Sequence, residues 1–249
     1  MAINKIVNSF DEAVADIFDG AVILLGGFGP ANGCPSNLLR ALVKQGAKNL
    51  TLVANTPGLG RRRFETPAPK VMRRMPPNYD DGGIIIENGQ VSKAICAFPG
   101  GGRLRDISPL HQKFDAGELE IELELQGTMA ERIRAAKAGI SAFFTPTSAG
   151  TIFEQGKEVR IIDGQKNVLE YALKADFALI RAHKADRYGN LVYQGTSRNF
   201  NATMAGAAKI TIAEVDQIVP LGDLDPETIV TPCIYVDRVV PRQNSGEGG

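Results

Sequence analysis

A cluster of glycines marks the part of the chain where the backbone could approach a ligand most closely. Residues 19–29 read DGAVILLGGFG, so the apolar run 21–25 leads directly into Gly26 and Gly27. Glycines between a buried strand and a helix let the backbone pass close to a ligand, and the helix N-terminus that follows favours an anion. The spacing matches neither a dinucleotide-binding GxGxxG nor a Walker loop. The stretch predicts either a ligand-binding turn or a tight strand-to-helix turn that binds nothing.

For the other titratable residues, the sequence predicts structural roles. His111 and His183 have no second ligand three or four residues away, so we expect no metal site. Arginine forks in the proline-rich stretch 57–82 could grip a phosphate or a dicarboxylate, but we favour a solvated loop or an interface there. The glutamates that alternate along one strand indicate a solvated or interface edge; they are Glu118, Glu120, Glu122 and Glu124.

Two strands and one helix must position the glycine turn. The runs 21–25 and 50–54 predict strands buried on both faces, and the helix between them opens near Ser36 and stops at Gly46. This strand–helix–strand order is a βαβ unit, which implies parallel pairing. We therefore expect an α/β fold with an open, mostly parallel sheet flanked by helices.

The remaining elements follow from periodicity and capping signals. Helices are predicted over 10–18, over 109–116, and from a capping box of Thr128 and Glu131 up to Gly139. Further strands are expected at 84–86, 94–98, 118–125, 141–144, 159–162, 177–182, 210–213 and 234–236. We expect one domain over 1–240 with a loop inserted at about 57–82, and a disordered polar tail over 241–249.

Composition narrows the class of protein. The 28 basic residues equal the 28 acidic residues in number, which gives no indication of nucleic acid or a membrane surface as a partner. Cys34, Cys96 and Cys233 show no CxxC or disulfide spacing, so we expect reduced thiols and a cytoplasmic protein. We also expect no signal peptide and no membrane-spanning helix.

Several long motifs resemble family I CoA-transferases, in the order in which their alpha subunits carry them. The family includes succinyl-CoA:3-oxoacid and 3-oxoadipate CoA-transferases, and its signature is similar to residues 19–28. The likeness covers nearly all of residues 9–240. It continues in QGTMAERIR (126–134), FTPTSAGT (144–151), KADRYGNLVY (184–193), SRNFN (197–201) and IYVDRVV (234–240).

The resemblance implies a fold, a reaction and a partner. The fold is the open sheet shared by CoA-transferases and sugar-phosphate isomerases. The reaction moves CoA between an acyl-CoA and a free carboxylic acid without a bound cofactor, because the CoA thioester is itself a substrate. A glutamate on a beta subunit forms a glutamyl-CoA thioester, in an αβ or α2β2 assembly. Gln126 would support the oxyanion, and Asn55, which matches the first residue of the family's NNAG motif, would be a second catalytic residue. The cleft for CoA would be lined by Gly26, Gly27, Phe28, Gly29 and Gly33.

Three departures from the family pattern lie near the expected substrate site. The loop after Phe28 has four residues, 29–32, where the family has three, and Thr56 replaces the second asparagine of a family NNAG motif. The stretch 57–82 is much longer than the family's usual connection. These differences concern the acyl substrate more than the fold.

Glu87 is the residue of this chain that competes for a catalytic role. The segment Glu87-Asn88-Gly89 is similar to the ENG that carries the beta subunit's glutamate, but it aligns with an ordinary turn of the alpha subunit, and Asn-Gly between apolar runs is a hairpin signal. We favour the turn. Two alternatives to a transferase subunit remain: a hydrolase or ring-opening enzyme of the same superfamily, which would need Glu87 or another carboxylate, and a non-catalytic ligand-binding domain.

Overall fold

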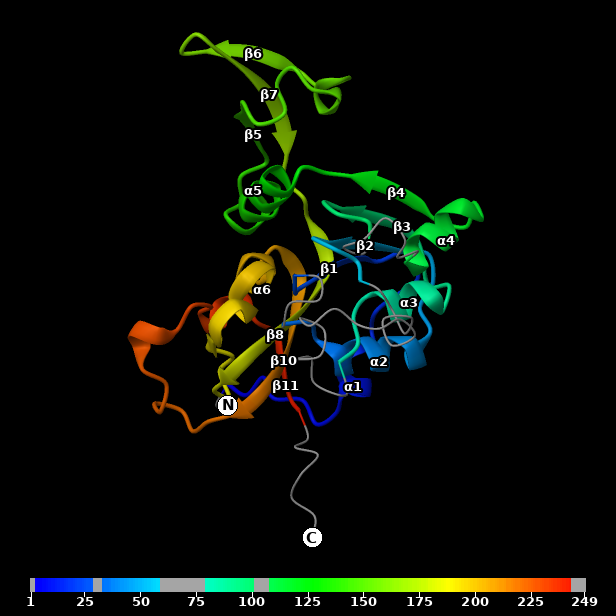
Figure 1. The fold of residues 1–249 in the computed structure, drawn as a ribbon. Helices are drawn as coiled ribbons and strands as arrows, with labels where there is room; N and C mark the ends of the chain where they lie inside the picture. Colours follow the sequence, from blue (N-terminus) through cyan, green and yellow to red (C-terminus); the bar gives the residue numbers. More distant parts are fainter. Residues whose placement is uncertain (1–2, 29–32, 59–78, 101–107, 243–249) are drawn as a thin grey trace.

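An eight-stranded, mostly parallel sheet forms the centre of the molecule (Figure 1) in a computed structural model that describes residues 3–28, 33–58, 79–100 and 108–242. The strand order is β11-β10-β8-β1-β2-β3-β4, and the short β9 pairs with β8 in the antiparallel direction. This arrangement confirms the expected α/β class. The strands are β1 Val22–Leu25, β2 Leu50–Ala54, β3 Val91–Cys96, β4 Glu120–Leu123, β8 Ala175–Ala185, β9 Leu191–Val192, β10 Ala208–Ile218 and β11 Arg238–Pro241.

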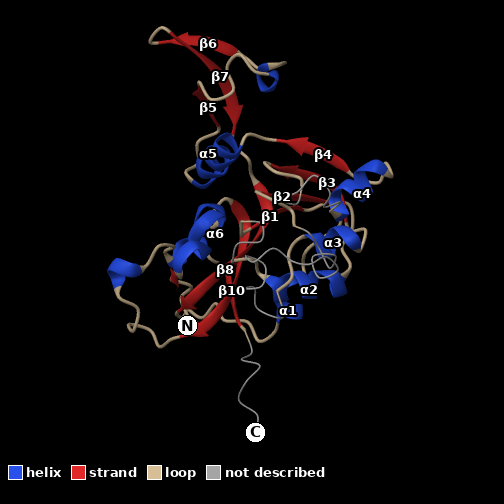
Figure 2. Ribbon diagram, viewed as in Figure 1, coloured by secondary structure: helices blue, strands red, loops and turns tan. Residues whose placement is uncertain are grey.

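Helices cover both faces of this sheet (Figure 2). Successive residues of a strand point to opposite faces, so Ile23 belongs to one apolar core and Leu24 to the other. The first core contains residues of α1 Phe10–Val14, α2 Ser36–Gln45, α3 Gly83–Glu87 and α4 Pro109–Asp115. The second contains residues of α5 Gln126–Lys137 and α6 Asn199–Met204. Burial on both faces explains why the central strands are continuous apolar runs.

A second, three-stranded antiparallel sheet extends away from the main body beyond α5 (Figure 1). Its strands are β5 Ala142–Thr145, β6 Val159–Ile162 and β7 Gln165–Tyr171, in the order β5-β7-β6. We call residues 142–171 the arm. The sequence predicted β5 and β6, but not β7 or the separate sheet that the three strands form.

The run 84–86 was wrongly predicted as a strand. It lies in α3, whose start is fixed by Asp81: the Asp81 side chain accepts a hydrogen bond from the Gly83 amide at 3.0 Å. All three isoleucines are buried, and an apolar run this short has no periodicity that separates a strand from one helical turn. Consequently 87–89 is not a hairpin turn. It is the C-terminal turn of a helix that leads into β3, with Gly89 at φ 69°.

Three further predictions need correction. Helix α1 is shorter than 10–18, although Ser9 caps it as expected by accepting from the Glu12 amide at 3.1 Å. Helix α5 begins at Gln126, so Thr128 lies inside its first turn and does not cap it. Residues 234–236 are not a strand, because a short 3-10 helix, Cys233–Tyr235, precedes β11. The other predicted strands and helices are present, with shifted ends.

Part of the prediction lies outside the described residues: Gly29, residues 59–78 of the inserted loop with their arginines, and residues 243–249 of the tail. In the part of the chain that the structure describes, no helix combines the length and the apolar composition needed to cross a lipid bilayer.

Candidate active site

The carboxyl ends of the central parallel strands bring the predicted site residues together. Gly26 directly follows β1 and Asn55 directly follows β2. Because Leu24 pairs with Val53, the same register places Gly26 beside Asn55 at the ends of neighbouring strands. Adjacent strands lie about 5 Å apart. Ligands of open parallel sheets bind at this edge, so the predicted residues occupy the expected side of the fold.

Asn55 and Gln126 are in direct contact. The Gln126 side-chain amide donates a hydrogen bond to the Asn55 side-chain oxygen at 2.6 Å, although the two residues are 71 positions apart. Asn55 is buried and its own amide nitrogen donates to the Thr56 hydroxyl at 3.1 Å. The Asn55 carbonyl also accepts from the Ala97 and Phe98 amides, which fastens the end of β3 to the end of β2.

This pair can act on developing negative charge. A carboxamide carries two N–H donors. Gln126 uses one of its donors in the contact with Asn55, which leaves its second N–H for an incoming oxygen. Gln126 is exposed, so a substrate can reach it, whereas the buried Asn55 holds it in place. An exposed amide donor held in place by a buried partner is one ingredient of an oxyanion hole.

A buried ion pair fixes the turn that carries Gln126. Glu124 is the residue before N-cap Leu125, and its carboxylate accepts from the Leu125 amide at 2.9 Å and pairs with Arg132 in α5. Arg132 also donates to the Tyr171 carbonyl of the arm at 2.8 Å. The interpretation of Glu124 as part of a solvated edge is therefore wrong, while Glu120 and Glu122 do lie at the edge and pair with Lys93.

Asn201 links the Gly33 end of the glycine turn to β8. Its side-chain oxygen accepts from the Arg181 amide at 2.9 Å, and its nitrogen donates to the Gly33 carbonyl at 2.9 Å. A Cβ on Gly26 would lie 1.9 Å from the Asn201 oxygen, so only glycine fits there. Gly33 has φ 115°, a backbone conformation that glycine adopts readily. Asn201 belongs to the SRNFN motif, but no local pattern in the sequence indicated this role.

Phe28 lies at the rim of the turn. It is 40% exposed and stacks on Phe200 of α6, with ring centroids 6.3 Å apart. An exposed aromatic ring can contact the apolar part of a ligand.

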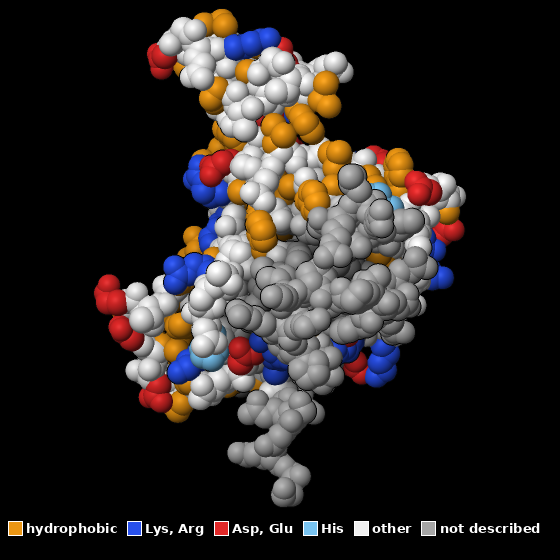
Figure 3. Space-filling model, viewed as in Figure 1, with side chains coloured by type: hydrophobic (Ala, Val, Ile, Leu, Met, Phe, Trp, Pro, Cys, Tyr) orange, Lys and Arg blue, Asp and Glu red, His pale blue; other side chains and the backbone are white. Residues whose placement is uncertain are grey.

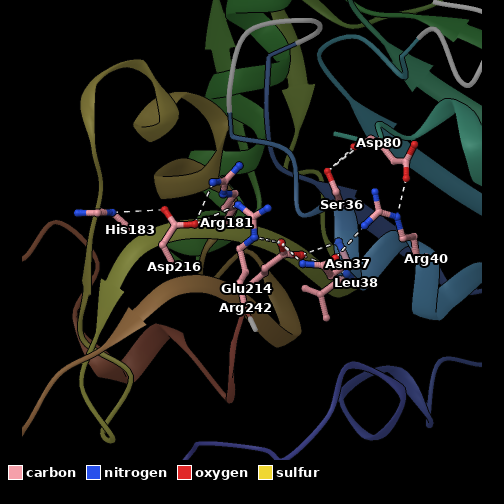
Figure 4. Close-up of polar contacts among 10 residues, drawn as sticks. All are labelled: Ser36, Asn37, Leu38, Arg40, Asp80, Arg181, His183, Glu214, Asp216 and Arg242. Carbon is pink, nitrogen blue, oxygen red and sulfur yellow. Dashed lines mark hydrogen bonds and ion pairs between the residues drawn. The ribbon is translucent and has the colours of Figure 1, made fainter. Parts of the chain in front are cut away.

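At the N-terminus of α2, the backbone donors that could bind an anion are already engaged. The carboxylate of Glu214 in β10 accepts from the Asn37 amide at 2.8 Å and from the Leu38 amide at 3.1 Å (Figure 4). The Ser36 amide donates to the Cys34 carbonyl and the Leu39 amide to the Pro35 carbonyl. Every backbone donor of the first turn is engaged inside the protein, because an internal carboxylate already occupies the position of an external anion.

Two residues that could have acted as nucleophiles are unsuited to the role. Cys96 ends β3 at the same sheet edge, but burial raises the pKa of its thiol to about 12, so the thiol stays protonated. Glu87 precedes β3, and the carbonyl of nearby Gln90 accepts from the Leu50 amide at the start of β2. Glu87 therefore lies at the amino edge of the sheet. The length of β2, about 16 Å, separates this edge from Asn55.

The histidines make local polar contacts. His111 contacts the hydroxyl of Ser108 at 2.9 Å, and His183 contacts Asp216 at 3.3 Å. Among the described residues, no group of three or more His, Cys, Asp or Glu side chains is arranged to hold a metal ion.

Comparison with known proteins places this arrangement in a family. A family model described as Coenzyme A transferase matches residues 7–242. The chain is 46% identical to the A subunit of 3-oxoadipate CoA-transferase from Pseudomonas putida, over 96% of this chain and 94% of that protein. It is 40% identical to the A subunit of succinyl-CoA:3-ketoacid coenzyme A transferase from Helicobacter pylori, over 95% and 91%. The chain belongs to the coenzyme A transferase family.

Solved structures share the fold. An acyl-CoA transferase from E. coli O157:H7, solved as a thioester complex with CoA, superposes with a TM-score of 0.78 at 21% identity. The match covers 96% of this chain and 47% of that chain, so this chain spans about half the length of that structure's polypeptide.

The ion pair beneath Gln126 gives a first prediction. Arg132→Ala leaves the buried Glu124 carboxylate without its partner, and we expect a loss of about 3 kcal/mol in the free energy of unfolding. Arg134→Ala is the matched control: it lies in the same helix and pairs with Glu131 in solvent, so its loss should be about 0.5 kcal/mol or less. Urea denaturation of the isolated chain measures both. Equal losses would contradict the importance given to the buried pair.

Proposed function

We propose that this chain is the alpha subunit of a CoA-transferase that moves CoA between an acyl-CoA and a free carboxylic acid, with 3-oxo acids as the preferred class. The contact between Gln126 and Asn55 is the observation that carries the proposal. It joins two residues that the family resemblance assigned to the reaction, and it holds the Gln126 amide at the sheet's carboxyl edge. The names of the relatives support the class of acid.

The reaction needs a carboxylate nucleophile, which we assign to a glutamate of a beta subunit. That carboxylate attacks the thioester carbonyl and the carbon–sulfur bond breaks. This step forms an acyl-glutamyl anhydride and releases CoA as a thiolate. The thiolate then attacks the glutamyl carbonyl and releases the acid, which gives glutamyl-CoA, and the second acid reverses the sequence. Each attack places negative charge on a carbonyl oxygen, and Gln126 would stabilise that oxygen from the alpha side.

The positions of this chain's own carboxylates support a nucleophile on the partner. Glu87 lies at the opposite edge of the sheet, and Glu124 is tied to Arg132 and lines a pocket on the side of the arm. The hydrolase alternative requires Glu87 or another carboxylate of this chain to act on the substrate, and the positions of Glu87 and Glu124 do not favour it. The contact between Gln126 and Asn55 does not favour a purely ligand-binding domain either, because such a domain needs no oxyanion donor.

Exposed apolar side chains near Gln126 support a partner surface. Leu123 of β4, Ile152 and Tyr171 are 48%, 75% and 64% exposed, and they line an open pocket of about 420 Å³ between the β4–α5 junction and the arm. Figure 3 shows apolar side chains on the arm and on the body below it. Exposed apolar patches of this kind mark interaction sites. The free cysteines support a cytoplasmic location for the complex.

The proposed division of labour predicts that the isolated chain transfers no CoA. Transfer of CoA from succinyl-CoA to acetoacetate or 3-oxoadipate should be measured with the alpha chain alone, the beta chain alone and the co-expressed pair. We expect turnover with the pair only, because neither half carries both the nucleophile and the oxyanion donors. Robust turnover by the alpha chain alone would overturn the two-subunit mechanism.

The oxyanion role predicts a large effect of Gln126→Ala. In the assembled enzyme we expect kcat to fall by about 10²- to 10³-fold, the usual loss for one oxyanion donor, with little change in KM for the acyl-CoA. Gln165→Ala, an exposed glutamine at the β6–β7 turn, is the control and should keep wild-type kinetics. An unchanged kcat in Gln126→Ala would remove this residue from the site.

The position of Glu87 predicts that its charge is not needed for catalysis. Glu87→Gln keeps the shape of the side chain, and a change outside the site usually alters stability by less than about 0.5 kcal/mol. We expect kcat of the assembled enzyme to stay within about threefold of wild type; a general base or nucleophile would cost at least about 10²-fold. Borohydride trapping during turnover checks the same point, since the modified glutamate should be on the beta chain. A modified Glu87 would favour the hydrolase alternative.

A further inference from the structure

Glu214 is a fully buried carboxylate that the proposed reaction does not use. It lies in β10, and its two oxygens face the first turn of α2 (Figure 4). One oxygen accepts from the backbone amides of Asn37 and Leu38, and the other accepts from the Asn37 side chain at 3.0 Å. Glu214 therefore fills the helix N-terminus that follows the glycine turn.

Cations balance this internal charge. Arg242, just after β11, lies 3.3 Å from Glu214 and also donates to Asp216 at 3.1 Å. Arg181 of β8 donates to the same Asp216 oxygen at 2.9 Å. Burial raises the pKa of Glu214, and Arg242, the two backbone donors and Arg181 oppose that rise. Burial alone would raise the pKa of Asp216, but Arg181, His183 and Arg242 lower it.

The contacts of Glu214 fix the return end of the glycine turn. Gly26 at the start of the turn is held to the Leu179 carbonyl of β8 at 2.9 Å, and Gly33 is held by Asn201. Three residues later, the Ser36 hydroxyl donates to the Asp80 carbonyl at 2.7 Å. Glu214 then binds the next two amides. Among these anchors Glu214 is the one acidic side chain, and it binds two successive amides of the helix backbone.

We propose that Glu214 is a positioning residue for the acyl-CoA cleft: it takes the place of a ligand phosphate at the N-terminus of α2 and thereby sets the position at which the chain returns from the cleft through Gly33. The proposal rests on the proposed function, because that function makes the glycine turn a wall of the cleft. It also implies that the phosphates of CoA bind away from the first turn of α2, whose donors are already engaged.

The test compares Glu214→Gln with Asp16→Asn. Both changes replace one carboxylate by an amide of the same shape, and Asp16 pairs with Arg238 of β11 and not with the segment 33–38. Hydrogen–deuterium exchange of the isolated chain measures whether the α2 amides are still protected by Glu214. It does not depend on enzymatic activity. We expect the Asn37 and Leu38 amides to exchange about tenfold faster in Glu214→Gln, and at the wild-type rate in Asp16→Asn. Unchanged exchange in Glu214→Gln would overturn the proposal.

Kinetic measurements on the assembled enzyme then test whether the contacts of Glu214 affect the binding of acyl-CoA. We expect KM for the acyl-CoA to rise about tenfold in Glu214→Gln, the loss of one hydrogen-bonded contact, while kcat per folded molecule falls less. A purely structural role would reduce the amount of active enzyme and leave KM unchanged, and that result would overturn the proposal. Asp16→Asn should keep the wild-type KM.

A second variant covers the case in which Glu214→Gln does not fold. Asn37→Ala removes only the side-chain donor and leaves the buried carboxylate with both backbone amides. We expect a smaller rise in KM, about threefold, and an unchanged KM in a folded Asn37→Ala enzyme would then overturn the proposal. If the wild-type pair transfers no CoA at all, the proposed function fails, whereas the exchange experiment still tests the anchor at α2.

Discussion

Parallel pairing of β1 with β2 and with β8 determines where every part of the candidate site can lie. β1 has only four residues, and it hydrogen-bonds to strands on both sides, in register with Leu52 through Ile23 and with Leu179 through Leu25. Because all three strands run in the same direction, the segments that follow them emerge at a single edge. Gly26 and Asn55 are thus brought together by backbone pairing before any side chain interacts.

Polar side chains then connect the segments that leave this edge. Gln126 reaches Asn55, Asn201 reaches the glycine turn, and Glu214 reaches α2. Asn55, Asn201 and Glu214 are buried, and a buried polar group is costly unless its hydrogen bonds are satisfied. Each therefore stabilises only one arrangement of the segments around it. The apolar cores hold the sheet and its helices together, whereas these polar contacts determine the shape of the candidate site.

The parts of the fold that could be predicted are those with an unambiguous local signal. The run 21–25, the glycine that stops α2 at Gly46, and the proline that opens α4 each have one structural interpretation, and the structure confirms them. The run 84–86 has two interpretations, and β-branched residues favoured the wrong one. The arm and the strand β7 were not predicted, because strand pairing across the arm depends on contacts that no local pattern records.

The residues of the candidate site also fall into those that could be predicted from the sequence and those that could not. Asn55 and Gln126 were predicted from resemblance, and the structure brings them into contact. Asn201 and Glu214 could not be found from the sequence, because an asparagine in a short helix and a glutamate in an apolar strand have no distinctive spacing. Glu214 is 176 residues from Leu38, and only the register of β10 against β8 shows that the two meet. Long-range polar contacts of this kind become visible only in three dimensions.

The fit between Gly26 and Asn201 constrains how the chain can evolve. Any side chain at position 26 would overlap the Asn201 carboxamide, yet a smaller residue at position 201 would release both Gly33 and the Arg181 amide. Neither position can change first without loss, so the two are expected to be epistatic. A lineage that altered one of them would have to cross a step of lower fitness, which restricts how far this turn can diverge even while the surrounding surface changes freely.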